Sequence, residues 1–366
     1  MSQAETRGGG GTLSFRPFAG EADLLAQRSL FRLCFPEVAE ETPATEEHYR
    51  WKFQSVRHTP PSYEYVAQLD QKLGGYYAAI PFRYTMGGHS ALAGMVCDVM
   101  THPEARGKGI FTKLGAYALG QMQEAGVNFT TGYPIRPEVI PGHLKVGWKV
   151  VENMPVYVKV LSARKVLQQK GVGFLAPLAN PIILLSHAFV CASKAYSVEK
   201  MTPNEAVESP WYPAFLRQWR AHVANALDKD SDFLKWRLGA PRTDYHFFVA
   251  RNNHGEPVGI CITRATDLQG VPTLAIVDLM LLPGQFKAFS SLDAALVKEA
   301  RSRGCELIAT MLAERWARQY CFLGSLYIKS PHVFSLIVKH LGTQPAPETL
   351  FQPASWHTMW IDSDDL

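Results

Sequence analysis

The feature that most constrains the fold of this chain is a series of sequence signals that occurs twice in the same order. Each series has a short helical segment with a Trp next to a basic residue, then two strand-like segments, then a third strand that ends in Asp, aliphatic, Met, any, any, Pro. The helical segments contain Trp51 and Trp236, and the strand endings begin at Asp98 and Asp278. The interval between the tryptophans nearly equals that between the aspartates. The shared order indicates two α/β domains in tandem, each with a mixed central sheet flanked by helices.

The boundaries of these domains follow from hydrophobic periodicity. Alternation predicts strands at residues 13–17, 63–69, 74–84 and 91–100 of the first series and at 245–251, 258–265 and 274–282 of the second. Amphipathic helices are expected at 21–34 and 288–303. We therefore expect a flexible tail at residues 1–12, a first domain at 13–161, a helical linker at 162–204 and a second domain at 205–366.

Composition narrows the class of protein further. The 366 residues are 47% hydrophobic and 19% charged, so both halves can build a core and the chain is not largely disordered. The net charge of +4 comes without a dense basic tract, so no nucleic-acid partner is expected. The six cysteines are widely spaced, which predicts reduced thiols and no metal site. With no signal peptide at the N-terminus, we expect a cytoplasmic protein.

One stretch, residues 172–196, is apolar enough to raise the question of a membrane span. Its run is interrupted by Pro177, Asn180, Pro181 and His187. A membrane span needs a longer uniform apolar run. We therefore expect helical packing between the domains and no membrane span.

The chemistry-bearing motif follows Pro103, where a strand ends and an amphipathic helix begins. The segment between them reads Arg106-Gly107-Lys108-Gly109. Amides in the first turn of a helix have no partner inside the helix, and the helix dipole makes that end partly positive. Glycines let a diphosphate approach the backbone, and basic side chains add charge. The spacing fits neither a Walker loop nor the GxGxxG fingerprint, so the sequence predicts a different diphosphate site.

This motif resembles the signature Gln/Arg-x-x-Gly-x-Gly/Ala of the GNAT superfamily of N-acetyltransferases, with Arg106 and Gly109 matching and Phe111 replacing the usual small residue. Residues 128–132 look like the family's fifth strand, which splays from the fourth to admit pantetheine. Residues 143–148 look like its Tyr-x-x-x-Gly-Phe ending. The resemblance covers about residues 13–161 and implies binding of acetyl-CoA or a related acyl-CoA as cosubstrate.

By the same resemblance, the coenzyme site lies in the first half of the chain. The strand edge would bind pantetheine and the loop with the first helical turn would hold the diphosphate. The implied residues are Val99, Met100, Thr101, Arg106, Gly107, Lys108, Gly109, Ile110, Phe111 and Thr112. The second series has residues 284–289 at the corresponding place, with one glycine and no arginine. We therefore predict one coenzyme site per chain and a degenerate second copy.

Two residues are candidates for proton transfer. Asp98 is beside the expected acyl site and is a possible base, although Asp278 at the matching position of the second copy favours a structural role. His143 lies where the family usually has the tyrosine that protonates the coenzyme thiolate, and an imidazole with a pKa near about 6.5 can act as acid or base. Strand alternation places Cys97 on the face opposite Asp98, as a small buried hydrophobe.

The function expected from this resemblance is N-acyl transfer from acyl-CoA to a small-molecule amine. Amino sugars are one acceptor class that tandem proteins of this kind suggest, and the second half would shape the acceptor pocket. Two alternatives stay open at this point. One is a non-catalytic acyl-CoA sensor or assembly module, suggested by Phe111. The other is an aminoacyl-tRNA-dependent transferase, a class that also pairs two GNAT-like halves. Nothing in the sequence sets the oligomeric state.

Overall fold

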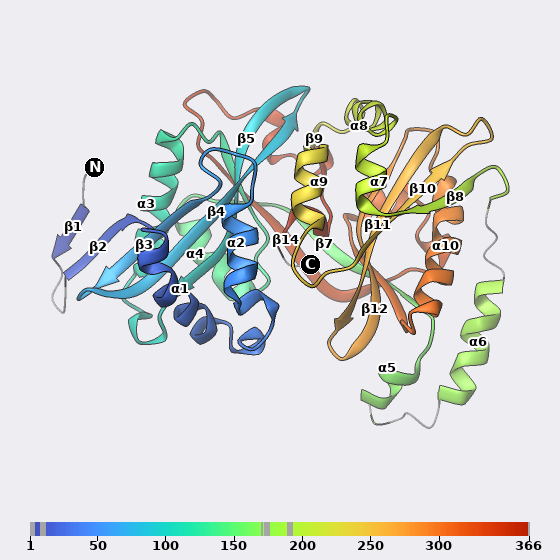
Figure 1. Ribbon diagram of the computed structural model, residues 1–366, viewed down its shortest axis with the longest axis horizontal. Coiled ribbons are helices and arrows are strands. Elements are labelled where there is room, and N and C mark those ends of the chain that lie inside the picture. Colours follow the sequence, from blue (N-terminus) through green and yellow to red (C-terminus); the bar gives the residue numbers. More distant parts are fainter. Residues whose placement is uncertain (1–3, 8–11, 170, 172–175, 189–192, 365–366) are drawn as a thin grey trace. The chain divides into compact units, whose positions relative to one another are not determined.

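The computed structural model describes residues 4–7, 12–169, 171, 176–188 and 193–364. The chain divides into two compact units, whose elements are labelled in Figure 1. The first unit consists of Met1–Val151, Gly239–Arg242 and Ser335–Gln352. The second consists of Glu152–Leu238, Thr243–Phe334 and Pro353–Leu366. Each unit therefore combines several chain segments, which differs from the uninterrupted domains expected from the sequence.

The first unit is built on a mixed sheet. Its strands are β1 (Ala4–Arg7), β2 (Thr12–Pro17), β3 (Tyr63–Leu69), β4 (Lys72–Met86), β5 (His89–Thr101), β6 (Phe129–Gly132) and the C-terminal part of β14 (Ile328–His340), in that spatial order. Neighbours are antiparallel except β5 and β6, which are parallel. β1 lies in the stretch for which the sequence predicts a flexible tail.

Helices cover both faces of this sheet. They are α1 (Glu21–Cys34), α2 (Glu46–Gln54), α3 (Ile110–Glu124) and α4 (Ile140–Lys145). The apolar stripe of α3 packs in one core with Tyr77 of β4 and Val96 of β5. The adjacent residue Tyr76 points to the other face, where its ring contacts Phe53 of α2. Alternation along β4 therefore supplies two cores, with α3 on one face and α2 on the other.

The second unit has its own mixed sheet. In spatial order its strands are β7 (Lys149–Val160), β13 (Leu307–Met311), β12 (Val271–Leu281), β11 (Pro257–Leu268), β10 (Tyr245–Arg251) and β8 (Ser197–Met201), while β9 (Asn225–Leu227) pairs with β15 (Trp356–His357). Its helices are α5 (Arg164–Gln169), α6 (Ala176–Ala188), α7 (Pro203–Glu208), α8 (Tyr212–Arg220), α9 (Ser231–Leu238), α10 (Ala288–Ser302) and α11 (Glu314–Gln319).

The second unit repeats the element order of the first. An antiparallel set of three strands, a helix and a parallel strand occur as β3–β4–β5–α3–β6 and again as β10–β11–β12–α10–β13. The third strand of each set carries one extra residue near its Asp. In the first unit Asp98 binds Lys52 at 2.9 Å, and in the second Asp278 binds Lys229 at 2.6 Å.

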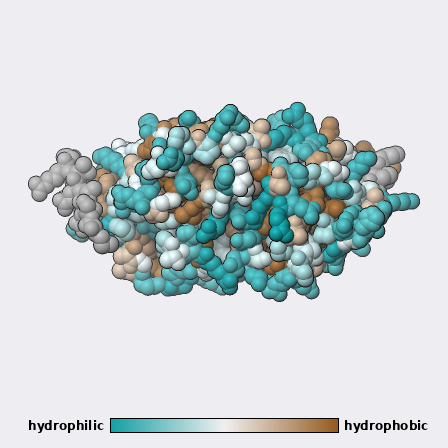
Figure 2. All heavy atoms as spheres, turned by 90° about the horizontal axis from the view of Figure 1, so that it is seen from above, coloured by the Kyte–Doolittle hydropathy of each residue, from teal (hydrophilic) through white to brown (hydrophobic). Residues whose placement is uncertain are grey.

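Two properties of the described residues bear on what a membrane-spanning protein requires, the length of their helices and the polarity of their surface. No described helix is both long and apolar enough to cross a membrane. On the face shown in Figure 2, hydrophilic residues predominate and apolar residues are scattered among them.

Candidate active site

The turn between β5 and α3 builds the first wall of the site. Helix α3 begins after Gly109, whose φ of 72° and ψ of 13° lie in the left-handed region. Gly107 also has a positive φ, of 78°. A side chain at either position would be strained, which explains the two glycines of the motif. The turn leaves the first amides of α3 facing outward without intrahelical partners, so this end attracts an anion.

The edge of β5 builds the second wall. Parallel pairing between β5 and β6 extends from Ala93 with Phe129 to Val96 with Gly132. Past Val96 the described residues of β6 no longer pair with β5, and the splaying of the two strands that the family resemblance implies stays a prediction. Residues 99–101 therefore lie on an edge of β5 with which no described strand pairs, and the Thr101 carbonyl there accepts a hydrogen bond of 3.5 Å from the Cys34 thiol. Such an edge can bind an extended chain as an added strand does.

Between these walls lies a cavity of about 690 Å³. This volume falls within the range of ordinary small-molecule sites, about 300–1,000 Å³. Its lining comprises Cys34, Phe35, Val99, Met100, Thr101, Ala105, Arg106, Gly107, Gly109, Ile110, Phe111, Thr112, Arg136, Glu138, Val139, Gly142 and Lys145. Of the residues that the sequence implies for the coenzyme, all except Lys108 are in this lining. Lys108 is exposed in the same loop.

The cavity lining is basic. The lining has one acidic residue, Glu138, and three basic residues, which are Arg106, Arg136 and Lys145. Arg136 forms an ion pair with Glu37 and donates a hydrogen bond of 3.2 Å to the backbone carbonyl of Cys34. An excess of positive charge beside outward-facing amides suits a diphosphate ligand.

Sequence reasoning did not identify several of these lining residues as part of the site. Cys34 and Phe35 come from the end of α1, and Lys145 comes from α4. Burial raises the pKa of the Cys34 thiol, so this lining residue is a neutral thiol. No local pattern in the sequence links these positions to the loop, because only the tertiary fold brings them together.

The ring of Phe111 packs against α4. An ideal Cβ placed on Gly142 would lie 2.5 Å from a ring atom of Phe111, so the ring rests directly on the glycine backbone. The ring also meets the His143 imidazole edge-to-face at a centroid distance of 5.0 Å. This contact explains how the helix start accommodates a bulky residue where the GNAT signature usually has a small one.

His143 is buried and does not line the cavity. Its ring lies between Phe111 and Trp148, at centroid distances of 5.0 and 5.1 Å, and it is 5% exposed. Burial lowers the pKa of His143 to about 4, so the imidazole is neutral near pH 7. Its Nδ1 atom has no hydrogen-bond partner among the described residues. The same burial makes this imidazole a weak base, and at pH 7 it is not the imidazolium that would donate a proton.

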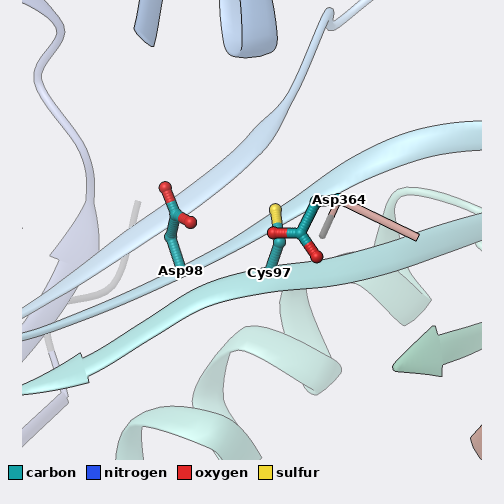
Figure 3. Close-up of side chains that lie close together, drawn as sticks. All are labelled: Cys97, Asp98 and Asp364. Carbon is teal, nitrogen blue, oxygen red and sulfur yellow. The ribbon is translucent and has the colours of Figure 1, made fainter. Parts of the chain in front are cut away.

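Asp98 forms a nearly buried ion pair and also does not line the cavity. Its side chain and that of Lys52 are 9% and 6% exposed. Asp98 has a φ of 48° and occupies the bulge of β5, where two residues stand opposite Tyr77. Figure 3 shows the side chains of Cys97 and Asp98 on the same side of the strand. The predicted opposite orientation of Cys97 is therefore wrong, because the extra residue interrupts the alternation.

The corresponding place in the second unit is occupied by aromatic side chains. Helix α10 follows Gly284, and Phe289 in its first turn stacks on Phe322 at a centroid distance of 4.7 Å. Phe289 is 1% exposed. Phe286, just before the helix, packs against Tyr320. The start of α10 is thus packed with rings where the start of α3 lines a cavity.

Comparison with known families identifies the first part of the chain. Residues 16–151 match the model of the acetyltransferase (GNAT) domain. This segment contains β3 to β6, the loop with Gly107 and Gly109, and every residue that lines the cavity. It is therefore a GNAT domain, and acyl transfer is the reaction class that the match supports. No curated protein sequence matches the chain.

Solved structures with a similar fold cover most of the chain. A GCN5-related N-acetyltransferase from Anabaena variabilis has a TM-score of 0.62 at 13% identity, over 90% of this chain and 73% of that one. A probable N-acyltransferase from Enterococcus faecalis has a TM-score of 0.64 at 14% identity, over 91% and 73%. Saccharomyces cerevisiae N-myristoyltransferase with bound myristoyl-CoA has a TM-score of 0.60 at 10% identity, over 90% and 79%. At these identities the likeness concerns the fold.

Proposed function

We propose that the GNAT domain at residues 16–151 binds an acyl-CoA in the cavity between β5, α3 and α4 and transfers the acyl group to an amine. One observation carries the proposal. A single basic cavity gathers the free edge of β5, the outward amides of α3 and Arg106. These are the groups that a pantetheine chain and a diphosphate need.

The division of labour among the residues follows from this placement. When bound, the coenzyme supplies a thioester whose carbonyl carbon is open to attack by an amine. Residues 106–112 hold the diphosphate, and the backbone of Val99, Met100 and Thr101 orients the pantetheine arm. The acceptor must lose a proton, because an ammonium group with a pKa near about 10 is not a nucleophile.

The proton acceptor is the open part of the mechanism. His143 is a neutral imidazole at pH 7, but its lowered pKa makes it a weak base, and two aromatic rings flank it outside the cavity lining. Asp98 is held by Lys52, as Asp278 is held by Lys229 in the second unit. Because the pair recurs where the phosphate loop is missing, a structural role accounts for Asp98 more simply than catalysis does. Both catalytic assignments stay predictions.

The acceptor and the acyl group belong to the proposal as well. We take the second unit to be a degenerate GNAT-like copy that shapes acceptor specificity, with amino sugars as the first acceptor class to test. Its repeated element order supports this view. The yeast N-myristoyltransferase was solved with myristoyl-CoA, so long acyl chains belong in the substrate screen beside acetyl-CoA.

Calorimetry followed by a transfer assay tests the proposal. CoA and acyl-CoA thioesters are titrated into the purified protein, and release of free CoA is then measured with amino sugars, aminoglycosides and peptides. We expect binding and acceptor-dependent release, with both reduced in Arg106→Ala and little changed in the exposed control Lys113→Ala.

Three results would contradict the proposal or favour one of the alternative functions. Absence of CoA binding would contradict the proposal. Binding without turnover on any amine would favour the non-catalytic sensor. Transfer that requires charged tRNA would favour the aminoacyl-tRNA-dependent class.

A further inference from the structure

Helix α6 of the second unit presents an unusual surface. Its outward side carries four large apolar residues, Leu178, Ile182, Leu184 and Leu185, which are 70%, 70%, 60% and 62% exposed. Pro177 and Pro181 are exposed beside them. At 100° per residue these positions occupy one arc of the helix, so the exposed face is continuous and apolar. We call these six residues the α6 face.

The opposite side of α6 attaches the helix to its unit. Asn180 accepts a hydrogen bond of 2.8 Å from the backbone N–H of Ala163, which immediately precedes α5. Ala179, Asn180 and Ile183 are partly buried on this side. In Figure 1 the two helices lie together at the periphery of the second unit. The attachment therefore fixes which side of α6 is exposed.

The α6 face differs from the other exposed apolar residues. Leu25 and Leu323 are 75% and 79% exposed, but neither has another exposed large apolar residue within four positions of it in the sequence. Single exposed apolar residues are ordinary on soluble proteins, whereas a contiguous apolar patch marks a contact surface.

The charge around α6 indicates what the α6 face contacts. No charged residue occurs within α6, and residues 162–198 contain no Asp or Glu. The same stretch has the basic residues Arg164, Lys165, Lys170 and Lys194. Arg164 pairs with Glu306, while Lys165 and Lys194 are exposed. Glu306, from outside this stretch, also accepts a hydrogen bond of 2.7 Å from the backbone N–H of Lys165. An apolar helix face whose flanking sequence is basic matches a surface with an apolar interior and anionic headgroups.

We propose that the α6 face docks the protein on the surface of an anionic phospholipid membrane. The apolar side chains enter the boundary between headgroups and acyl chains, and Lys165 and Lys194 attract the phosphates. At 13 residues, α6 is about 20 Å long, which is enough for its apolar side chains to lie along the interface together. This inference is independent of the acyl transfer proposed for the first unit.

Vesicle sedimentation with the full-length protein tests the docking. Vesicles of phosphatidylcholine alone are compared with vesicles that also contain phosphatidylglycerol. We expect the wild type to sediment with the anionic vesicles. Leu178→Glu with Leu185→Glu should reduce the partition coefficient by about a hundredfold, because two apolar side chains no longer enter the lipid. Lys165→Gln and Lys194→Gln should each reduce it about fivefold.

Matched controls make the result decisive. Leu25→Glu and Leu323→Glu remove equally exposed leucines elsewhere and should leave vesicle binding unchanged. Circular dichroism and thermal melting establish that each variant is folded.

Three outcomes would overturn the proposal. One is a folded wild type that does not bind anionic vesicles. Another is vesicle binding that the double Glu variant retains. If the wild type is instead a dimer by sedimentation velocity and that variant is monomeric, the face joins two copies of the chain and the membrane proposal is wrong.

Discussion

At the scale of single residues, Phe111 and Gly142 depend on each other. A Cβ at position 142 would overlap the Phe111 ring, at 2.5 and 2.9 Å from two ring atoms. Because both residues line the cavity, a displaced ring would enter the space proposed for CoA. Overpacking of this kind costs about 1–3 kcal/mol. We therefore expect Gly142→Ala to weaken CoA binding about tenfold by calorimetry.

The double variant distinguishes this cause from a general loss of structure. Phe111→Ala with Gly142→Ala removes the overlap and should bind CoA within about threefold of the wild type. Equal affinity of Gly142→Ala and the wild type would show that the ring does not need the glycine.

His143 gives a pH-dependent stability whose sign follows from its burial. The pKa of His143 is lowered to about 4 in the folded protein, from 6.5. As pH falls below about 6.5, the unfolded chain takes up a proton that the folded protein refuses, so the free energy of unfolding decreases. The decrease from this group is about 2 kcal/mol between pH 7 and pH 5.

Urea unfolding of the wild type and His143→Gln at both pH values measures this contribution. The other titrating groups are common to both proteins, so the variant should lose about 2 kcal/mol less than the wild type over this interval. Identical losses in the two proteins would mean that the imidazole is not held neutral in the folded state.

At the scale of elements, replacing a glycine by alanine should change the free energy of unfolding in opposite directions at Gly109, in the loop, and at Gly120, in α3. Gly109 needs its left-handed conformation to start α3, so Gly109→Ala should lower the free energy of unfolding by about 1–2 kcal/mol. Gly120 lies inside α3, and a Cβ there would have no atom within 4 Å. Gly120→Ala should therefore raise it by about 0.5–1 kcal/mol. Thermal melting checks both, and destabilisation by Gly120→Ala would contradict the comparison.

The ion pair between α2 and the bulge of β5 can be tested for structure and catalysis together. Removing one partner leaves a buried charge, so Asp98→Asn or Lys52→Met should each cost about 3–5 kcal/mol. The double variant removes both charges of the pair and should regain most of that stability.

The same variants separate the two roles of Asp98. If Asp98 is structural, transfer activity returns with stability in the double variant. If Asp98 is the base, activity stays at least about a hundredfold reduced in every variant that lacks the carboxylate, whatever its stability.

The sequence predicts those elements that are determined by residues close together in the chain, and it does not predict features that depend on distant residues. Strands β3 to β5, the glycine loop and α3 follow from periodicity and turn chemistry within a few residues. The bulge at Asp98 breaks the alternation without a recognisable signal, so the orientation of Cys97 was predicted wrongly. The contributions of Cys34 and Lys145 to the cavity come from elements far apart in the chain, which no local pattern reveals.

At the scale of the whole molecule, the main departure from the sequence-based picture is the return of residues 335–352 to the first unit. Ile337 pairs with Gly132 and His340 with Phe129, which makes the C-terminal part of β14 the neighbour of β6. Ile337 and Leu341 belong to the same core as α3. This pairing joins residues about two hundred positions apart, so continuous domain boundaries could not have included it.

The interleaving predicts that residues 1–161, the expected tail and first domain, do not fold alone. Such a fragment leaves β6 without its antiparallel neighbour and exposes the core that Ile337 and Leu341 cover. Burial of these two side chains alone contributes about 3–6 kcal/mol, a large part of the about 5–15 kcal/mol that stabilises a typical domain. We expect no cooperative thermal transition and no CoA binding by this fragment.

Joining residues 335–352 to the end of this fragment through a glycine–serine linker should restore both the thermal transition and CoA binding, since the segment can then pair with β6. A fragment that melts cooperatively without this segment would mean that β14 is dispensable for the first unit.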